Sequence, residues 1–102
     1  MQTRDDDLKI KVYDDSMVDV GIYPEDYVHI SPLTDAQDGD IVIAQLNGAV
    51  LLRKYFIINK TVCLVPENVS YPTIELNDSD EFEVVGIVRK IVNLRKEAFS
   101  HA

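Results

Sequence analysis

The sequence lacks the features that membrane proteins and disulfide-stabilised proteins require. No apolar run approaches the roughly 20 residues that a membrane-spanning helix needs. Residues 1–7 are polar and acidic, which differs from the basic and then apolar pattern of a secretory leader. The single cysteine, Cys63, excludes an internal disulfide and lies in an apolar run typical of a buried strand. We therefore expect a cytoplasmic protein without a membrane partner.

Basic residues are also in deficit. The chain has 10 Lys and Arg against 18 Asp and Glu, a formal net charge of -8. Such a charge repels a phosphate backbone, so we do not expect this stretch to bind DNA by itself. Histidine is scarce too: His29 lies between two apolar residues and His101 lies in the tail, and neither has a second His or Cys at ligand spacing. We expect no metal and no cofactor.

The residues that are present favour a mainly β structure. A chain of 102 residues fits one domain. The pair Asn47-Gly48 separates two β-prone runs and predicts a hairpin with a type I′ turn, because both residues tolerate a positive φ. Helix is indicated only by a possible turn at residues 16–20 and weakly in the tail. We predict strands at residues 9–13, 27–30, 41–46, 49–56, 61–65 and 82–92.

Five motifs follow one another between about residues 10 and 95. They are 12–17 (VYDDSM), 21–28 (GIYPEDYV), 38–44 (DGDIVIA), 64–68 (LVPEN) with 71–74 (YPTI), and 84–88 (VVGIV). In this order they resemble the motifs of the LexA/UmuD-like self-cleaving repressor family. The resemblance implies a LexA- or signal-peptidase-like β-barrel or β-ribbon domain with little helix. We place this domain at residues 9–95, between a polar segment, 1–8, and a tail, 96–102.

The resemblance also implies a catalytic role for one serine. In the family a serine attacks a peptide bond after a neutral lysine takes its proton, and Ser16 occupies the nucleophile position. A serine hydroxyl needs such a base within hydrogen-bond reach, and burial can lower the pKa of an amine toward neutrality. The oxyanion would be stabilised by the backbone N–H groups of Asp15 and Ser16.

The base position departs from the family pattern. The lysine position falls on Arg53, and Lys54 takes the following position, which is commonly Arg. Arginine holds its proton in proteins and cannot act as a general base at neutral pH. Lys54 is a possible substitute, but adjacent strand residues face opposite ways unless a β-bulge intervenes. We expect an impaired dyad, in which the Ser16 hydroxyl caps a short helix instead.

Further departures point the same way. Asp15 follows Asp14 where the family often has Gly, and Glu25 replaces the Gly of the Gly-Asp turn. These carboxylates raise the negative charge near the oxyanion position, and one of them could pair with Arg53. The family cleaves a bond between a small residue and Gly, whereas here the residues before the four glycines are Val20, Asp38, Asn47 and Val85. Only 15 residues precede Ser16, too few for a cleavage loop or a DNA-binding head.

The resemblance leaves three functions open. The first is a regulatory and dimerisation domain of a prophage-derived or SOS-response repressor, a homodimer that contacts DNA only through an absent amino-terminal domain. Residues 84–94 would pair two subunits, or would form a central strand instead. The second is an active Ser-Lys peptidase that carries out autoproteolysis. The third is a UmuD-like accessory protein of a DNA polymerase, and a RecA-type filament is a possible partner.

Overall fold

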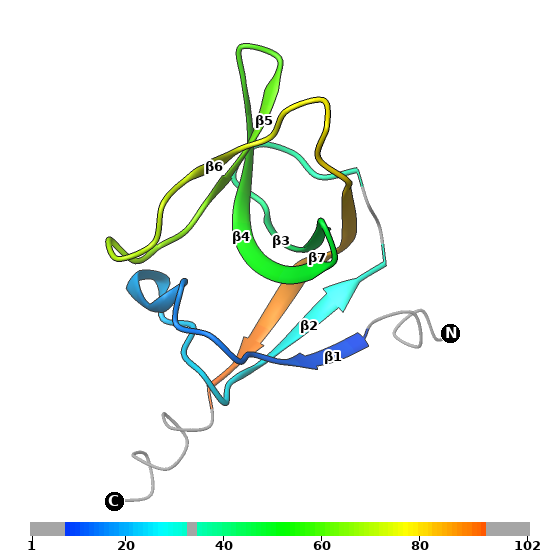
Figure 1. The fold of residues 1–102 in the computed structure, drawn as a ribbon. Coiled ribbons are helices and arrows are strands. Elements are labelled where there is room, and N and C mark those ends of the chain that lie inside the picture. Colours follow the sequence, from blue (N-terminus) through cyan, green and yellow to red (C-terminus); the bar gives the residue numbers. More distant parts are fainter. Residues whose placement is uncertain (1–7, 33–34, 94–102) are drawn as a thin grey trace, which may run out of the picture.

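Seven antiparallel strands form one curled sheet (Figure 1). The computed structural model describes residues 8–32 and 35–93. Within them the only helix is a 3₁₀ turn, η2, Val18–Val20. The strands are β1 Leu8–Lys11, β2 Tyr27–Ser31, β3 Ile41–Leu46, β4 Ala49–Ile58, β5 Thr61–Val65, β6 Ile74–Glu75 and β7 Phe82–Val92. The expected mainly β fold with little helix is confirmed, whereas most of segment 1–8 and all of tail 96–102 lie outside the described residues.

Two tight turns set the register of the middle of the sheet. The predicted hairpin is confirmed: Asn47 and Gly48 have φ of 51° and 88° and join β3 to β4. A second two-residue turn, with φ of 52° at Asn59 and 68° at Lys60, joins β4 to β5. It was not predicted, because Lys is unusual at a position that requires positive φ.

The long strand β7 lies between β2 and β3 in the sheet order β1-β2-β7-β3-β4-β5-β6. Its carboxy-terminal half pairs with β2, from Ile87 to Val92, and its amino-terminal half pairs with β3, from Phe82 to Ile87. Next to this crossing, a Cβ at Gly86 would lie 2.5 Å from the carbonyl oxygen of Ser31, so only glycine fits. No described strand pairs with residues 88–92 on the β3 side, so β7 is a central strand with one free half-edge.

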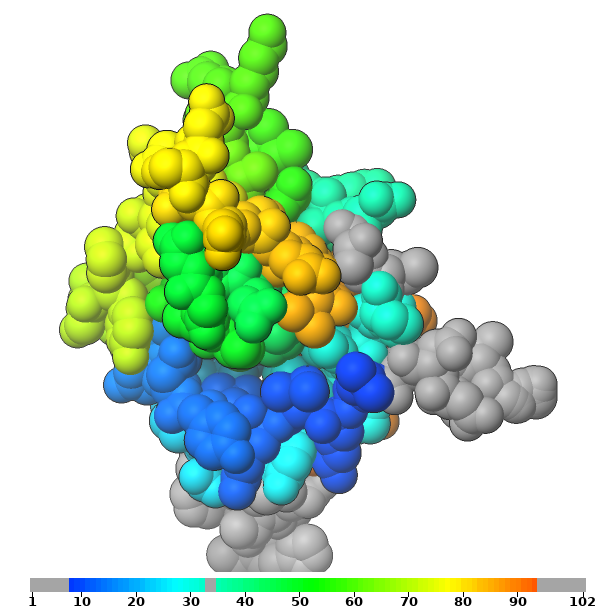
Figure 2. Space-filling view, turned by 45° about the vertical axis from the view of Figure 1, so that its right-hand side comes forward, coloured from blue at the N-terminus to red at the C-terminus, as the bar shows by residue number. Residues whose placement is uncertain are grey.

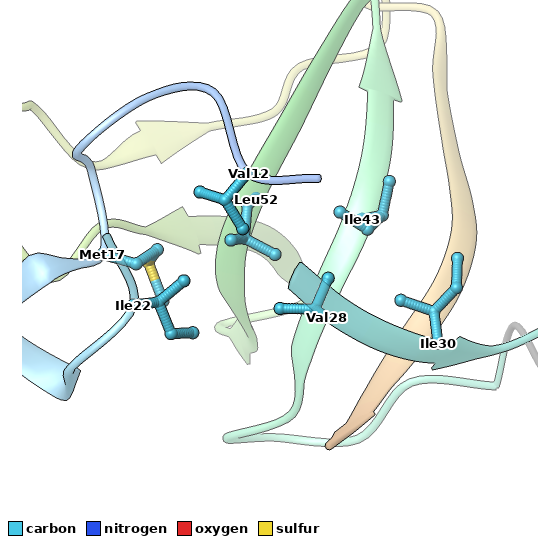
Figure 3. Packing of buried hydrophobic residues seen from close by; sticks show 7 residues of the cluster. All are labelled: Val12, Met17, Ile22, Val28, Ile30, Ile43 and Leu52. Carbon is cyan, nitrogen blue, oxygen red and sulfur yellow. The ribbon is translucent and has the colours of Figure 1, made fainter. Parts of the chain in front are cut away.

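Side chains on both faces of β3 are buried. Ile43 packs into the larger cluster, with Val12, Met17, Ile22, Val28, Ile30 and Leu52 (Figure 3). Val42 and Ala44 point to the other face and pack with Val84. Because Val12 and Met17 belong to the larger cluster, the segment between them is anchored at both ends. That segment contains Ser16.

Candidate active site

The Ser16 side chain is fully buried beside the sheet. Its backbone carbonyl accepts a hydrogen bond from the N–H of Glu67 at 2.7 Å, and the carbonyl of Glu67 accepts one from the N–H of Asp19 at 2.8 Å. The loop after β5 therefore holds the segment on both sides of the serine. Met17 is the N-cap residue of η2, and no side chain caps this helix. The expectation that Ser16 caps it is wrong, because the hydroxyl is engaged elsewhere.

Arg53 is the cation that contacts Ser16. It lies in β4 opposite Val42, and only 5% of it is exposed. Its Nη1 donates to Ser16 Oγ at 2.8 Å and to the carbonyl oxygen of Leu52 at 2.9 Å. The guanidinium also lies over the ring of Tyr71, 5.4 Å from its centroid. Burial lowers the pKa of Arg53 below its ordinary value, while Asp14 and Tyr71 act in the opposite direction. A guanidinium nevertheless remains protonated at neutral pH.

Lys54 points to the other face of β4. Its Nζ lies 3.3 Å from Oε2 of Glu67, and its side chain is 28% exposed. The pairing of β4 with β3 and with β5 runs without a register shift at this position, so no bulge turns the lysine toward the serine. Of the two cations that the sequence singles out, the structure brings Arg53 to Ser16 and directs Lys54 to Glu67.

A carboxylate completes the surroundings of the serine. Asp14 Oδ1 accepts hydrogen bonds from Ser16 Oγ at 2.9 Å and from the Ser16 backbone N–H at 3.2 Å. Asp14 Oδ2 lies 3.9 Å from Nη1 of Arg53. The hydroxyl thus donates to a carboxylate and accepts from a guanidinium, and a second acceptor, the carbonyl oxygen of Leu52, lies 3.3 Å away. No neutral amine takes part among these contacts.

The side chain of Asp15 turns away from Ser16. Its carboxylate accepts a hydrogen bond from the hydroxyl of Tyr71 at 2.7 Å, and its backbone carbonyl accepts one from Nδ2 of Asn68 at 2.8 Å. The hydrogen bond to Asp15, with burial as a second cause, raises the pKa of Tyr71 above its ordinary value. Asn68 and Tyr71 belong to a motif noted in the sequence, but their contacts with the serine loop were not predicted. Their spacing carries no signal that links them to a residue more than 50 positions earlier.

Glu25 lies apart from the guanidinium. Its Oε1 is 3.1 Å from Nζ of Lys11, so the carboxylate that lies within ion-pair distance of Arg53 is that of Asp14 and not that of Glu25. The φ of Glu25 is 79°, a left-handed conformation that glycine adopts readily and other residues rarely do. Beside it, the fully buried Asp26 accepts from Nδ2 of Asn93 at 2.6 Å. The same amide group donates to the carbonyl oxygen of Gly21 at 3.0 Å.

An apolar groove of about 300 Å³ leads along the site. It lies between the amino-terminal segment and the start of β4, which face each other in Figure 2 as blue and green surfaces. No described strand pairs with residues 49–53 on the side of β4 opposite β3, and β1 is an edge strand, so both walls have free backbone groups. The lining residues are Ile10, Lys11, Val12, Tyr13, Asp14, Ile43, Val50, Leu51 and Leu52.

Two classes of site find no support in the described part of the chain. No three His, Cys, Asp or Glu side chains in residues 8–32 and 35–93 are grouped so that they could hold a metal ion. Across the same ranges, no helix is long and apolar enough to cross a membrane.

Comparisons with known proteins identify one family model and several relatives that this chain resembles. The model of the Peptidase S24-like family matches residues 1–89. LexA repressor 2 of Pseudomonas putida is 37% identical over 84 residues, 82% of this chain and 42% of that protein. The LexA repressor of Magnetococcus marinus is 37% identical over 79 residues, 78% of this chain and 34% of that protein. The LexA repressor of Clostridioides difficile is 36% identical over 88 residues, 85% of this chain and 41% of that protein. The chain thus spans less than half the length of these relatives.

Proposed function

Because the chain belongs to the Peptidase S24-like family, we propose that it is the carboxy-terminal regulatory and dimerisation domain of a LexA-like transcriptional repressor with an impaired catalytic dyad. The observation that carries the proposal is the 2.8 Å hydrogen bond from the Arg53 guanidinium to Ser16 Oγ. A serine becomes a nucleophile when a base takes its proton, and a guanidinium donates protons without accepting them. Ser16 therefore occupies the position of a nucleophile but has no lysine amine beside it to take its proton.

Lys54 does not compensate for this loss. Its ammonium group is paired with Glu67 on the opposite face of β4, and it would have to break that pair and cross the strand to reach the hydroxyl. In this proposal the domain holds its fold and its partner contacts and does not cleave its own chain.

Dimerisation is supported by the free half-edge of β7. Residues 88–92 pair with β2 on one side and with no described strand on the other. An open row of backbone N–H and C=O groups is a template for pairing with an identical strand around a two-fold axis. We expect sedimentation equilibrium to give twice the chain mass. A mass of one chain at high protein concentration would argue against this part of the proposal.

The test of the impaired dyad is self-cleavage of the full-length protein. Incubation near pH 10, where a lysine begins to lose its proton, should yield no fragment that depends on Ser16. Ser16→Ala and Lys54→Ala variants, incubated in parallel, distinguish self-cleavage from contaminating proteases. A fragment that forms in the wild type and disappears in both variants would show an active peptidase with Lys54 as the base.

A further inference from the structure

The carboxylate of Asp14 accepts hydrogen bonds from both the backbone N–H and the hydroxyl of Ser16. Its Oδ1 lies 3.2 Å from the backbone nitrogen of Ser16 and 2.9 Å from Ser16 Oγ. The backbone N–H of a nucleophilic serine is a common donor to the oxyanion of the tetrahedral intermediate. That donor is already bound to an anion within the same loop.

Two independent features hold the carboxylate there. The guanidinium of Arg53 lies 3.9 Å from Asp14 Oδ2 and supplies a buried positive charge. The backbone of the loop is fixed by the bond between the Ser16 carbonyl and the Glu67 N–H, and by packing of Val12 and Met17 in the core. Asp14 is separated from Ser16 by one residue, so its carboxylate reaches the Ser16 N–H without distortion of this frame, as in an Asx-type turn.

We propose that Asp14 is an inhibitory residue, which occupies the oxyanion donor of Ser16 and blocks catalysis independently of the missing base. This inference rests on the proposed function and adds a second cause of inactivity to the missing base. A carboxylate in this position opposes catalysis in two ways. It removes a hydrogen-bond donor from the developing oxyanion, and its charge repels the charge that forms there. Restoration of the lysine alone is therefore insufficient.

Two variants test whether Asp14 inhibits a Ser-Lys dyad. Arg53→Lys restores a lysine base and keeps Asp14, whereas Asp14→Ala/Arg53→Lys restores the base and also removes the Asp14 carboxylate. Loss of one oxyanion donor slows catalysis by about 10²- to 10³-fold in other serine enzymes. We expect the double variant to react about 100-fold faster at Ser16 than Arg53→Lys does.

A fluorophosphonate probe measures this reactivity without a cleavable peptide bond. The Ser16 Oγ–phosphorus bond forms, fluoride leaves, and the amine at position 53 takes the hydroxyl proton, so the adduct is detected by intact mass. Ser16→Ala in the double-variant background shows that labelling occurs at this residue. The matched control is Asp19→Ala/Arg53→Lys, which removes one exposed carboxylate from the following 3₁₀ turn and should react at the rate of Arg53→Lys.

The outcomes separate this inference from the proposed function. Rapid labelling of wild-type Ser16 would overturn the proposed function. Equal rates for Arg53→Lys and the double variant, or no labelling of a double variant that unfolds cooperatively, would overturn only the role of Asp14. If the double variant does not fold, amide hydrogen exchange decides: Asp14→Ala alone should speed exchange of the Ser16 N–H about tenfold through loss of its hydrogen bond. An unchanged exchange rate would contradict the inference.

Discussion

The two faces of β4 give adjacent cations opposite surroundings. On one face Arg53 is 5% exposed and is bonded to a hydroxyl and a backbone carbonyl. On the other face Lys54 is 28% exposed and paired with one carboxylate at the surface. Charged groups near water contribute little to stability, whereas a buried guanidinium depends on every partner around it. The order of two basic residues along a strand thus decides which side chain is buried against the serine and which one forms a surface ion pair.

Truncation of Arg53 and of Lys54 should change the free energy of unfolding by very different amounts. Arg53→Ala should lower the free energy of unfolding by about 2 to 4 kcal/mol, because it leaves a cavity and removes the buried hydrogen bond that Arg53 donates to Ser16 Oγ. Lys54→Ala should lower it by less than about 1 kcal/mol. Urea unfolding at pH 7 measures both. Arg53→Met is the control: it keeps most of the volume but loses the same hydrogen bond, so a smaller loss than in Arg53→Ala measures the contribution of the cavity. Equal losses of stability in the two alanine variants would show that Arg53 contributes no more to the fold than Lys54 does.

A smaller effect should show that the turn before β2 carries backbone strain. Glu25 adopts a φ of 79° in the turn whose backbone bonds to Val12. Glu25→Gly should raise the free energy of unfolding by about 0.5 to 1 kcal/mol through relief of this conformation, less the small contribution of the exposed pair with Lys11. Asn59→Gly is the control at a hairpin with φ of 52°, and its gain should be smaller because Asn tolerates this region. Thermal unfolding of the wild type, Glu25→Gly and Asn59→Gly measures these differences in stability. A loss of stability in Glu25→Gly would show that the backbone of Glu25 is not strained.

The smallest expected effect concerns pH and the ring that lies against Arg53. The hydrogen bond to Asp15 raises the pKa of Tyr71, so the protonated phenol is favoured in the folded state. Its stabilisation is fully present below the usual tyrosine pKa of about 10, and it is lost as the pH rises through the raised value. The urea midpoint should therefore fall less between pH 9 and pH 11 in Tyr71→Phe than in the wild type. Parallel curves would mean that this hydrogen bond does not contribute.

Local features of the sequence predicted the fold well. The alternation of polar and apolar residues located β1, apolar and β-branched runs located β5 and β7, and the Asn47-Gly48 pair located the central hairpin. The two-residue β6 was missed, since two residues give no period. The register shifts at Ile43/Ala44 and His29/Ile30 were also missed, because a bulge inserts one residue without a characteristic sequence.

The candidate site was predictable only where it follows strand geometry. Alternation along β4 directs Arg53 and Lys54 to opposite faces, and the contacts of both side chains agree with that rule. The contacts of Asp14 were not predictable, because they depend on the rotation of one loop side chain and not on a repeat. The helix-cap prediction for Ser16 was wrong for a related reason: η2 begins one residue later than expected. The sequence predicted negative charge near the site, but the hydrogen-bond partners of these carboxylates depend on the conformation of the loop.

The side chain of Asn93 joins two parts of the molecule that the sequence keeps far apart. Asn93 directly follows Val92, the last residue of β7. Its Nδ2 donates hydrogen bonds to the carbonyl oxygen of Gly21 and to the carboxylate of Asp26, in the turn that precedes β2. The end of β7 is therefore joined to this turn by a side chain as well as by its backbone pairing with β2. Loss of the Asn93 side chain would therefore take a hydrogen-bond donor from the fully buried Asp26 and release the end of β7 from the turn at the same time.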